Sequence, residues 1–186
     1  MDAAAAPEPA PAPDAVLERA RAVRLLVLDV DGVLTDGRLY YATGGEETKA
    51  FNIQDGLGIK LLQRSGVQVA VITGRRSAAV GRRVRELGIA AFHEGAEDKL
   101  RVFEQLLAQS GLAAGAAACM GDDLPDLPVM RRCILGLTVP DAPQLVRAHA
   151  HHVTRQRGGE GAVREACELV MQAQGTLAAV LREYLA

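Results

Sequence analysis

Residues 23–37 of the chain read VRLLVLDVDGVLTDG. Five of the six residues 25–30 are apolar, which is typical of a strand buried on both faces of a parallel sheet. Asp29 and Asp31 follow at its end, and Gly32 indicates that the chain turns there. A buried sheet seldom ends in two closely spaced anions without a cation or a reaction that needs them. Because ligands of open α/β sheets bind beyond the carboxyl ends of the strands, this stretch predicts a functional site.

Further apolar runs alternate with helical patterns along the chain. We expect strands at 67–73, 89–92, 116–120 and 133–137, and helices at 14–22, 57–65, 77–87 and 97–109. This alternation predicts an α/β fold, a doubly wound (Rossmann-like) parallel sheet with right-handed crossovers. Residues 37–52 predict a β-hairpin flap directly after the first strand.

The domain organisation follows from composition and connection lengths. Residues 1–14 form an Ala/Pro-rich stretch that predicts a disordered tail, and residues 15–186 predict one domain. No insertion is long enough for a separate cap domain. Residues 155–186, which begin with a glycine-rich run, predict a C-terminal tail with one or two closing helices.

Composition argues against several classes of protein. A formal charge of −2, few aromatic residues and no tryptophan predict no nucleic-acid partner. No apolar run approaches the roughly 18 residues that a membrane span needs. The start of the chain lacks the basic and apolar regions of a secretion signal. The scattered Cys119, Cys133 and Cys167 favour a reducing compartment, so we expect a cytoplasmic protein.

Three predicted strand ends carry polar residues that should meet in one crevice. They are Asp29 with Asp31, then Thr73, then Asp122 with Asp123. Four carboxylates in one crevice would repel one another unless a divalent cation lay among them. Oxygen ligands without histidine or cysteine favour Mg²⁺.

The remaining residues of the crevice suit a phosphate group. Lys99, early in its helix, would place an ammonium beside the anion, and Thr73 with the Gly74 amide would donate hydrogen bonds to it. We infer in-line attack by one aspartate on phosphorus, which gives an aspartyl-phosphate. Asp31 would protonate the leaving alkoxide and then deprotonate the hydrolytic water.

The stretch DVDGVLTDG, at 29–37, resembles the first motif of the haloacid dehalogenase superfamily of phosphotransferases, in its capless subclass. Thr73 matches the second motif, Lys99 the third and residues 121–123 the fourth. The resemblance implies that Asp29 is the nucleophile and Asp31 the acid/base. It also implies that Mg²⁺ is held by the Asp29 carboxylate, the Asp31 backbone carbonyl and Asp122, with Asp123 outside these ligands or acting through water.

Residues 23–174 resemble more narrowly the 3-deoxy-D-manno-octulosonate 8-phosphate (KDO 8-phosphate) phosphatases. The likeness runs through KAFNIQDGLGIK, VAVITGR, GDDLPDLPVM and VTRQRGGEGAVRE. It implies hydrolysis of that sugar-acid phosphate in lipopolysaccharide precursor synthesis. It also implies a homotetramer in which hairpins pair between subunits and the glycine-rich tail closes a neighbouring site. The substrate-binding residues it implies are Asn52, Ile53, Gln54, Asp55, Gly56, Lys60, Gly74, Arg75, Arg83 and Lys99.

Other interpretations remain open from the sequence. The substrate could be a nine-carbon ulosonate 9-phosphate or a broader set of sugar phosphates. A phosphomutase, or a non-catalytic partner domain, would belong to a different class. The spacing of His149, His151 and His152 suits neither a helix face nor a strand face, so we expect no metal site there.

Overall fold

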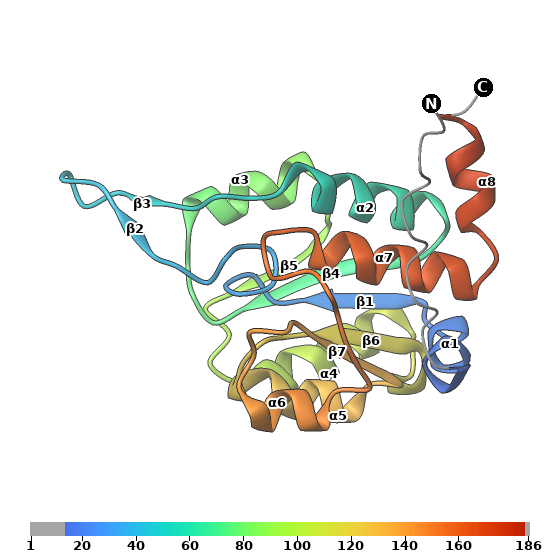
Figure 1. Cartoon of the computed structure of the whole chain (residues 1–186). Coiled ribbons are helices and arrows are strands. Elements are labelled where there is room, and N and C mark those ends of the chain that lie inside the picture. Colours follow the sequence, from blue (N-terminus) through green and yellow to red (C-terminus); the bar gives the residue numbers. More distant parts are fainter. Residues whose placement is uncertain (1–13, 185–186) are drawn as a thin grey trace.

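A six-stranded parallel sheet forms the centre of the molecule, in the order β5-β4-β1-β6-β7-β8 (Figure 1). The computed structural model describes residues 14–184. The strands of the sheet are β1 (Leu25–Leu28), β4 (Gln68–Thr73), β5 (Ala91–Glu94), β6 (Ala117–Met120), β7 (Leu135–Thr138) and β8 (His152–Val153). Every pair of neighbours in this sheet is parallel, which confirms the predicted fold class.

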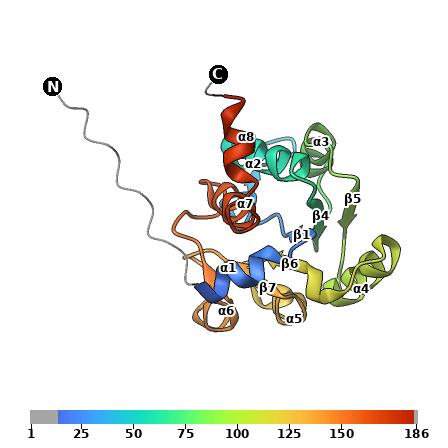
Figure 2. The same ribbon diagram turned by 90° about the vertical axis from the view of Figure 1, so that its right-hand side faces the viewer.

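Helices cover both faces of the sheet, as the end-on view in Figure 2 shows. One face carries α2 (Ile53–Arg64), α3 (Ala78–Glu86) and α7 (Ala162–Ala173), and the other carries α4 (Lys99–Ser110), α5 (Leu127–Arg132) and α6 (Gln144–His149). The smaller elements are α1 (Asp14–Arg21), α8 (Leu177–Arg182) and the 3₁₀ turns η1 (Ala114–Ala116) and η2 (Leu124–Asp126). No helix within residues 14–184 combines the length and the apolar character that crossing a bilayer requires.

The central strand β1 sets the position of the site. All four of its residues are buried, because strands flank it on both edges and helices cover both faces. Leu28 lies opposite Val71 of β4 and Met120 of β6, so these three strands end at nearly the same level. The chain leaves β1 for β4 and β5 on one side and then returns to β6 on the other. This reversal is the switch point at which open α/β sheets bind ligands.

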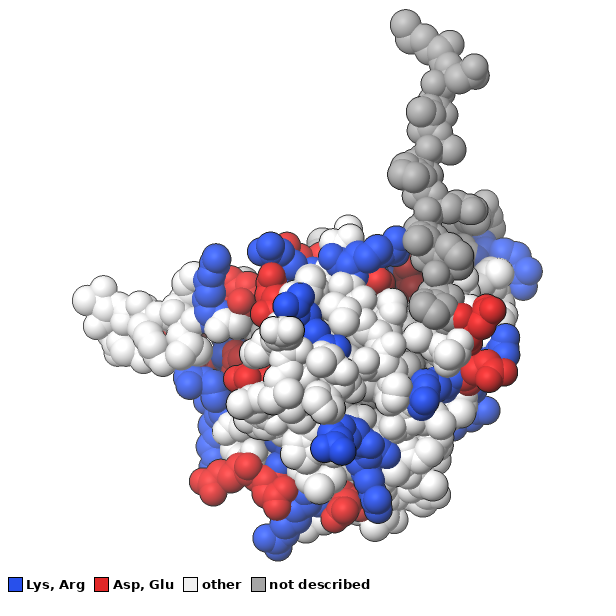
Figure 3. Space-filling model, turned by 60° about the horizontal axis from the view of Figure 1, so that its bottom comes forward, with Lys and Arg blue, Asp and Glu red and all other residues white. Residues whose placement is uncertain are grey.

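The predicted hairpin is present and short. Strands β2 (Tyr40–Tyr41) and β3 (Glu47–Thr48) pair antiparallel outside the main sheet. Figure 1 shows the hairpin projecting from the body, and Figure 3 shows its outer part as a largely uncharged projection. Leu39, Tyr40 and Tyr41 are exposed along it. Within residues 14–184, this hairpin is the only element inserted between β1 and α2.

Helix α2 begins at Ile53, four residues before the predicted start at residue 57. Asn52 is its N-cap, and its side-chain oxygen accepts a hydrogen bond from the Gln54 N–H at 2.8 Å. Gly56 and Gly58 lie inside the helix and are buried. A Cβ on Gly56 would overlap the Arg83 guanidinium, and one on Gly58 would lie 2.8 Å from Arg164 Cδ. The two glycines therefore allow close packing where a helix would otherwise favour larger residues.

The structure describes the predicted C-terminal tail almost completely but little of the predicted N-terminal tail. Residues 1–13 of the expected N-terminal tail lie outside the described residues, and Asp14 begins α1. In the C-terminal segment, residues 162–173 form α7, whose apolar side is part of the hydrophobic core. Contacts join α7 to α2 and to α1. This segment, up to Tyr184, is therefore built into its own domain.

Candidate active site

Asp29 and Lys99 form a buried ion pair at the carboxyl end of β1. The Lys99 Nζ lies 2.9 Å from Asp29 Oδ1, and both side chains are less than a tenth exposed. Lys99 is the first residue of α4, where the Asp98 side chain caps the helix by accepting the Arg101 N–H at 3.0 Å. The cap fixes the start of the helix, so the ammonium is held at the strand end.

Asp126 is a second carboxylate that binds Lys99, and it is a site residue that our sequence reasoning missed. Its Oδ1 accepts a hydrogen bond from Lys99 at 2.7 Å, and its Oδ2 accepts the N–H groups of Asp122 and Asp123 at 3.1 and 3.2 Å. Gly121 is required beside it, because a Cβ there would overlap the Asp126 side chain. The loop after β6 is thus wrapped around the Asp126 carboxylate.

Oxygen atoms of Asp29, Asp122 and Asp126 all lie within 4.8 Å of one another. Burial raises the pKa of Asp29 to about 6, with the Asp126 charge adding to the effect and Lys99 opposing it. Burial also raises the pKa of Asp122 to about 7, with further contributions from Asp29 and Asp126. A bound dication would relieve this repulsion, and the all-carboxylate donor set fits Mg²⁺. The residues present therefore fit the cation that the sequence predicts.

Asp123 is placed differently from its neighbours. Its carboxylate accepts the Leu124 N–H at 2.7 Å and caps η2, and it is not part of the carboxylate group described above. Asp122, by contrast, is packed so closely that a Cβ on Gly32 would overlap its carboxylate. The structure thus brings Asp126 rather than Asp123 to the centre of the site.

Burial alone would lower the pKa of Lys99, but the carboxylates of Asp29 and Asp126 raise it above its ordinary value. The side chain therefore stays a cation although it is buried. A fixed positive charge beside Asp29 is suited to stabilise an anion that approaches this carboxylate.

Asp31 faces cations that come from other elements. Its Oδ1 contacts the Lys49 ammonium, and its Oδ2 lies 3.8 Å from Arg75 Nε. Glu47 binds the same two cations, with Arg75 Nη2 at 2.8 Å and Lys49 Nζ at 3.6 Å. Sequence reasoning missed Lys49 and Glu47, because charged hairpin residues are usually solvated.

Thr73 is buried at the end of β4, beside β1. Its hydroxyl oxygen accepts the Arg75 N–H at 3.4 Å, and its carbonyl accepts the Ala96 N–H at 3.0 Å. A Cβ on Gly74 would lie 3.7 Å from the Ala96 carbonyl oxygen, an ordinary contact. The polar end of β4 therefore lies next to the Asp29 strand end, as the sequence predicts.

The expected substrate-binding residues of α2 fall into two groups. Ile53, Gln54 and Lys60 are exposed. Lys60 lies eight residues beyond the N-cap, which is about 12 Å along the helix axis. Asp55 and Gly56 are buried, and the Asp55 Oδ1 accepts the Arg164 N–H at 2.7 Å. Asp55 therefore contacts α7, and Gly56 packs against Arg83 of α3. The substrate-binding roles implied for these two residues stay a prediction.

Arg83 reaches the N-cap of α2 from α3. Its Nη2 donates to the Asn52 carbonyl oxygen at 3.2 Å, and its guanidinium carbon lies 5.9 Å from the centre of the Phe51 ring. The Arg83 Nε is buried without a hydrogen-bond acceptor. The Arg83 guanidinium therefore stabilises the loop before α2 through its hydrogen bond to the Asn52 carbonyl.

The glycine-rich loop of the C-terminal segment packs on the loop that follows β1 in the same chain. The Gly159 N–H donates to the Val33 carbonyl oxygen at 3.0 Å. A Cβ on Gly158 would overlap the Gly32 carbonyl oxygen, and one on Gly159 would lie 2.7 Å from the Asp36 nitrogen. The loop therefore lies beside the site of its own chain, and its closing over a neighbouring subunit's site stays a prediction.

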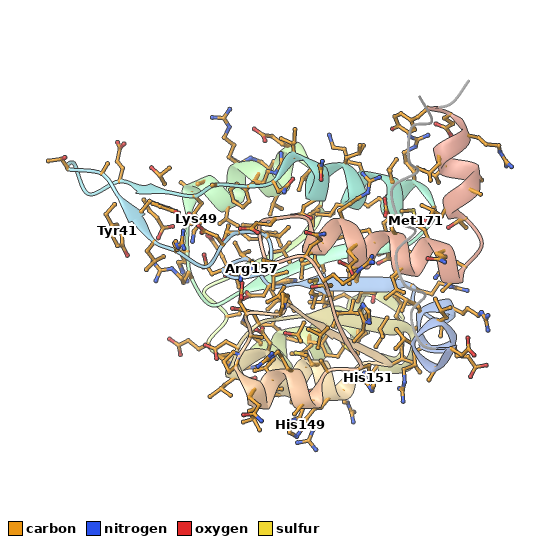
Figure 4. All side chains as sticks on the ribbon, viewed as in Figure 1. Tyr41, Lys49, His149, His151, Arg157 and Met171 are labelled. Carbon is orange, nitrogen blue, oxygen red and sulfur yellow. The ribbon has the colours of Figure 1, made fainter. Side chains whose placement is uncertain are left out.

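The histidines are separate from one another and from the site. The His151 Nδ1 accepts the Gly136 N–H at 2.8 Å, the His149 ring contacts the Leu145 carbonyl, and His152 lies 3.8 Å from Glu165. Figure 4 shows His149 and His151 beside α6, away from the hairpin end. None of the three belongs to a possible metal-binding group within the described residues.

The site is arranged for phosphoryl transfer. It holds a buried aspartate beside a lysine and two further carboxylates that can bind a dication. A second aspartate follows the first by two positions along the loop. On a doubly wound sheet with no inserted domain among the described residues, this site defines a capless phosphotransferase of the haloacid dehalogenase type.

Comparison with known proteins narrows this class, although no family model matches the chain. The 3-deoxy-D-manno-octulosonate 8-phosphate phosphatase KdsC of Yersinia pestis is 47% identical over 90% of this chain and 89% of its own. The protein of the same name from Escherichia coli K12 is also 47% identical, over 87% and 86%. The chain belongs to the 3-deoxy-D-manno-octulosonate 8-phosphate phosphatase family.

A solved structure supports the same grouping. The 3-deoxy-D-manno-octulosonate 8-phosphate phosphatase of Moraxella catarrhalis, in complex with a magnesium ion, a phosphate ion and KDO, superposes with a TM-score of 0.89 at 43% identity. The match covers 91% of this chain and 97% of that one.

Proposed function

We propose that the chain is a Mg²⁺-dependent phosphatase that hydrolyses KDO 8-phosphate to KDO and inorganic phosphate, for lipopolysaccharide precursor synthesis. The observation that carries this proposal is the buried Asp29–Lys99 pair beside Asp122 and Asp126. The relatives named above supply the substrate, and the magnesium ion of the Moraxella catarrhalis complex supports the choice of cation.

In the proposed reaction, an Asp29 oxygen attacks phosphorus in line with the ester oxygen and forms an aspartyl-phosphate. Asp31 gives its proton to the leaving oxygen, and then takes a proton from the water that attacks the aspartyl-phosphate. Lys99 keeps its charge beside Asp29 and stabilises the transferring phosphoryl oxygens, with Thr73 and the Gly74 amide as hydrogen-bond donors.

The cation would be held by the carboxylates of Asp29 and Asp122 and by the backbone carbonyl of Asp31. Asp126 lies within the same oxygen cluster, and Asp123 would act outside these ligands or through a water. When bound, Mg²⁺ supplies charge neutralisation at the phosphoryl group.

For the rest of the substrate we propose contacts from exposed and half-buried groups around the crevice. They are Asn52, Ile53 and Gln54 at the start of α2, Lys60 further along it, and Arg75 and Arg83. The substrate carries a carboxylate as well as a phosphate, so these cations complement its charge.

We also propose a homotetramer in the cytoplasm. The exposed Leu39, Tyr40 and Tyr41 of the hairpin and the 81% exposed Ile53 offer apolar surface for subunit contacts. The three cysteines are buried free thiols, which fits a reducing compartment. Sedimentation analysis should give a tetramer, and Tyr41→Glu should shift it toward smaller species. A monomeric wild-type protein with full activity would refute the tetramer.

The function is tested by phosphate release from KDO 8-phosphate and from a nine-carbon ulosonate 9-phosphate, each with and without Mg²⁺. We expect preference for the eight-carbon substrate and dependence on the cation. Asp29→Asn should abolish release while the melting temperature shows a folded protein. A preference for the nine-carbon compound would overturn the substrate, and an active Asp29→Asn variant would overturn the nucleophile.

A further inference from the structure

Lys49 is a buried lysine that the reaction described above does not use. It follows β3 at the base of the hairpin, and its side chain has no exposed surface. Figure 4 shows Lys49 where the hairpin meets the body, whereas Tyr41 lies further out. A lysine is almost never fully buried unless its charge is paired. The partners of the ammonium therefore indicate what the side chain does.

Those partners form a closed ring of alternating charges. The Lys49 ammonium contacts Asp31 Oδ1 and lies 3.6 Å from Glu47 Oε1. On the other side, Arg75 Nη2 lies 2.8 Å from Glu47 Oε2, and Arg75 Nε lies 3.8 Å from Asp31 Oδ2. Each oxygen of the Asp31 carboxylate thus faces a cation, one from the hairpin and one from the segment after β4.

Lys49 is the stronger of these two constraints on Asp31. Within residues 14–184 it is the only group that donates a hydrogen bond to the Asp31 carboxylate. Arg75 is nearly half exposed, and its contact with Asp31 is longer than a hydrogen bond. The orientation of Asp31 therefore depends chiefly on one buried side chain of the hairpin.

Orientation matters for this carboxyl because proton transfer needs the two heavy atoms within about 2.6–3.2 Å. A displacement of about 1 Å can reduce a rate by roughly 100-fold. We propose that Lys49 is a positioning residue that holds Asp31 for protonation of the leaving oxygen, so that the hairpin takes part in catalysis. The proposal rests on the proposed role of Asp31.

The step balances without further reactants. The O–H bond of Asp31 breaks while the P–O bond to the leaving group breaks, and the proton goes to the leaving oxygen. The carboxylate that remains stays paired with the Lys49 ammonium. Contact with Lys49 thus holds the carboxylate in place for the next step, in which it takes a proton from the hydrolytic water.

The test compares two leaving groups. The alkoxide of KDO 8-phosphate needs a proton as it leaves, whereas the phenolate of p-nitrophenyl phosphate needs much less help. We expect Lys49→Met to lower kcat for the sugar phosphate by about 100-fold, with KM little changed. With p-nitrophenyl phosphate, the same variant should lower kcat by about tenfold or less. Lys49→Arg should restore part of the difference. Equal losses with both substrates, or no loss, would overturn the proposal.

Two further variants keep the test decisive. Glu46→Gln changes an exposed charge on the same hairpin and should behave as wild type with both substrates. If Lys49→Met does not fold, Lys49→Gln replaces it. Because Gln keeps a donor without the charge, its loss should be smaller but should still be greater with the sugar phosphate than with p-nitrophenyl phosphate. A wild-type protein that releases no phosphate from either substrate would overturn the phosphatase function and this proposal together. Equal losses in the Lys49 variants, with an active wild-type protein, would instead overturn only the role of Lys49.

Discussion

Replacing Asp126 by asparagine should destabilise the protein and impair the site together. One Asp126 oxygen accepts a hydrogen bond from Lys99, and the other accepts two backbone N–H groups. An asparagine has one acceptor oxygen, so its amide would point a donor either at the ammonium or at the backbone donors. Removing one partner of a buried ion pair costs about 3–5 kcal/mol. Lys99 keeps Asp29, so we expect a loss of about 3 kcal/mol in the free energy of unfolding.

The effect is measured by urea unfolding without Mg²⁺ and by phosphate release during a Mg²⁺ titration. We expect Asp126→Asn to reduce activity or cation affinity by about 10- to 100-fold. Asp123→Asn is the matched control, because Asp123 caps η2 and asparagine caps as well as aspartate. Its stability should change by less than about 0.5 kcal/mol. If Asp123→Asn were as harmful as Asp126→Asn, the assignment of the two residues would be wrong.

Three further predictions concern other parts of the molecule. Gly158→Ala should destabilise by about 1–3 kcal/mol and lower activity, because its Cβ would overlap the loop after β1, whereas Gly115→Ala meets nothing and should be nearly neutral in urea unfolding. Burial opposes ionisation of Glu165, but hydrogen bonds from His152 and the Arg155 and Gln156 amides lower its pKa from 4.5 to about 2. Its stabilisation, about 1–2 kcal/mol after solvent screening, is present above pH 4.5 and is lost as the pH falls toward 2. Glu165→Gln should therefore differ from wild type in unfolding free energy at pH 7 and match it near pH 2. The raised pKa values of Asp29 and Asp122 mean that the metal-free fold loses stability as the pH rises from about 4 to 7. Since Mg²⁺ binds the ionised carboxylates, it should raise the melting temperature more at pH 8 than at pH 5; an equal rise would contradict the site.

The fold could be predicted because its signals are local. Residues 25–28 are all apolar and are followed by charged residues, so both the burial of β1 and the position of its end follow from the pattern. Thr73 likewise follows an apolar run, and the parallel order of the strands brings it beside Asp29. Lys99 was predicted from its place early in a helix, and the structure adds that the Asp98 cap holds it there.

The residues that were missed or misplaced depend on contacts across the chain. Asp126 shares a short acidic stretch with Asp122 and Asp123, and composition does not indicate which carboxylate turns inward. The spacing of Asp123 and Asp126 gave one usable signal, since it matches the capping box that the structure forms. Lys49 is buried through an ion pair with a residue 18 positions away, which no local periodicity indicates. Asp55 is buried against α7, whose close approach depends on Gly58 of α2.

The packing of Gly158 and Gly159 on the loop after β1 bears on when the protein becomes competent during synthesis. Strand β1 and its aspartates leave the ribosome before the segment that supplies the hydrogen bond from Gly159 to Val33 has been made. The Asp55 carboxylate waits in the same way for Arg164, 109 residues later. Contacts of such long sequence separation form late in folding. A nascent chain therefore carries its nucleophile long before residue 159 is made and the surrounding loop can be completed.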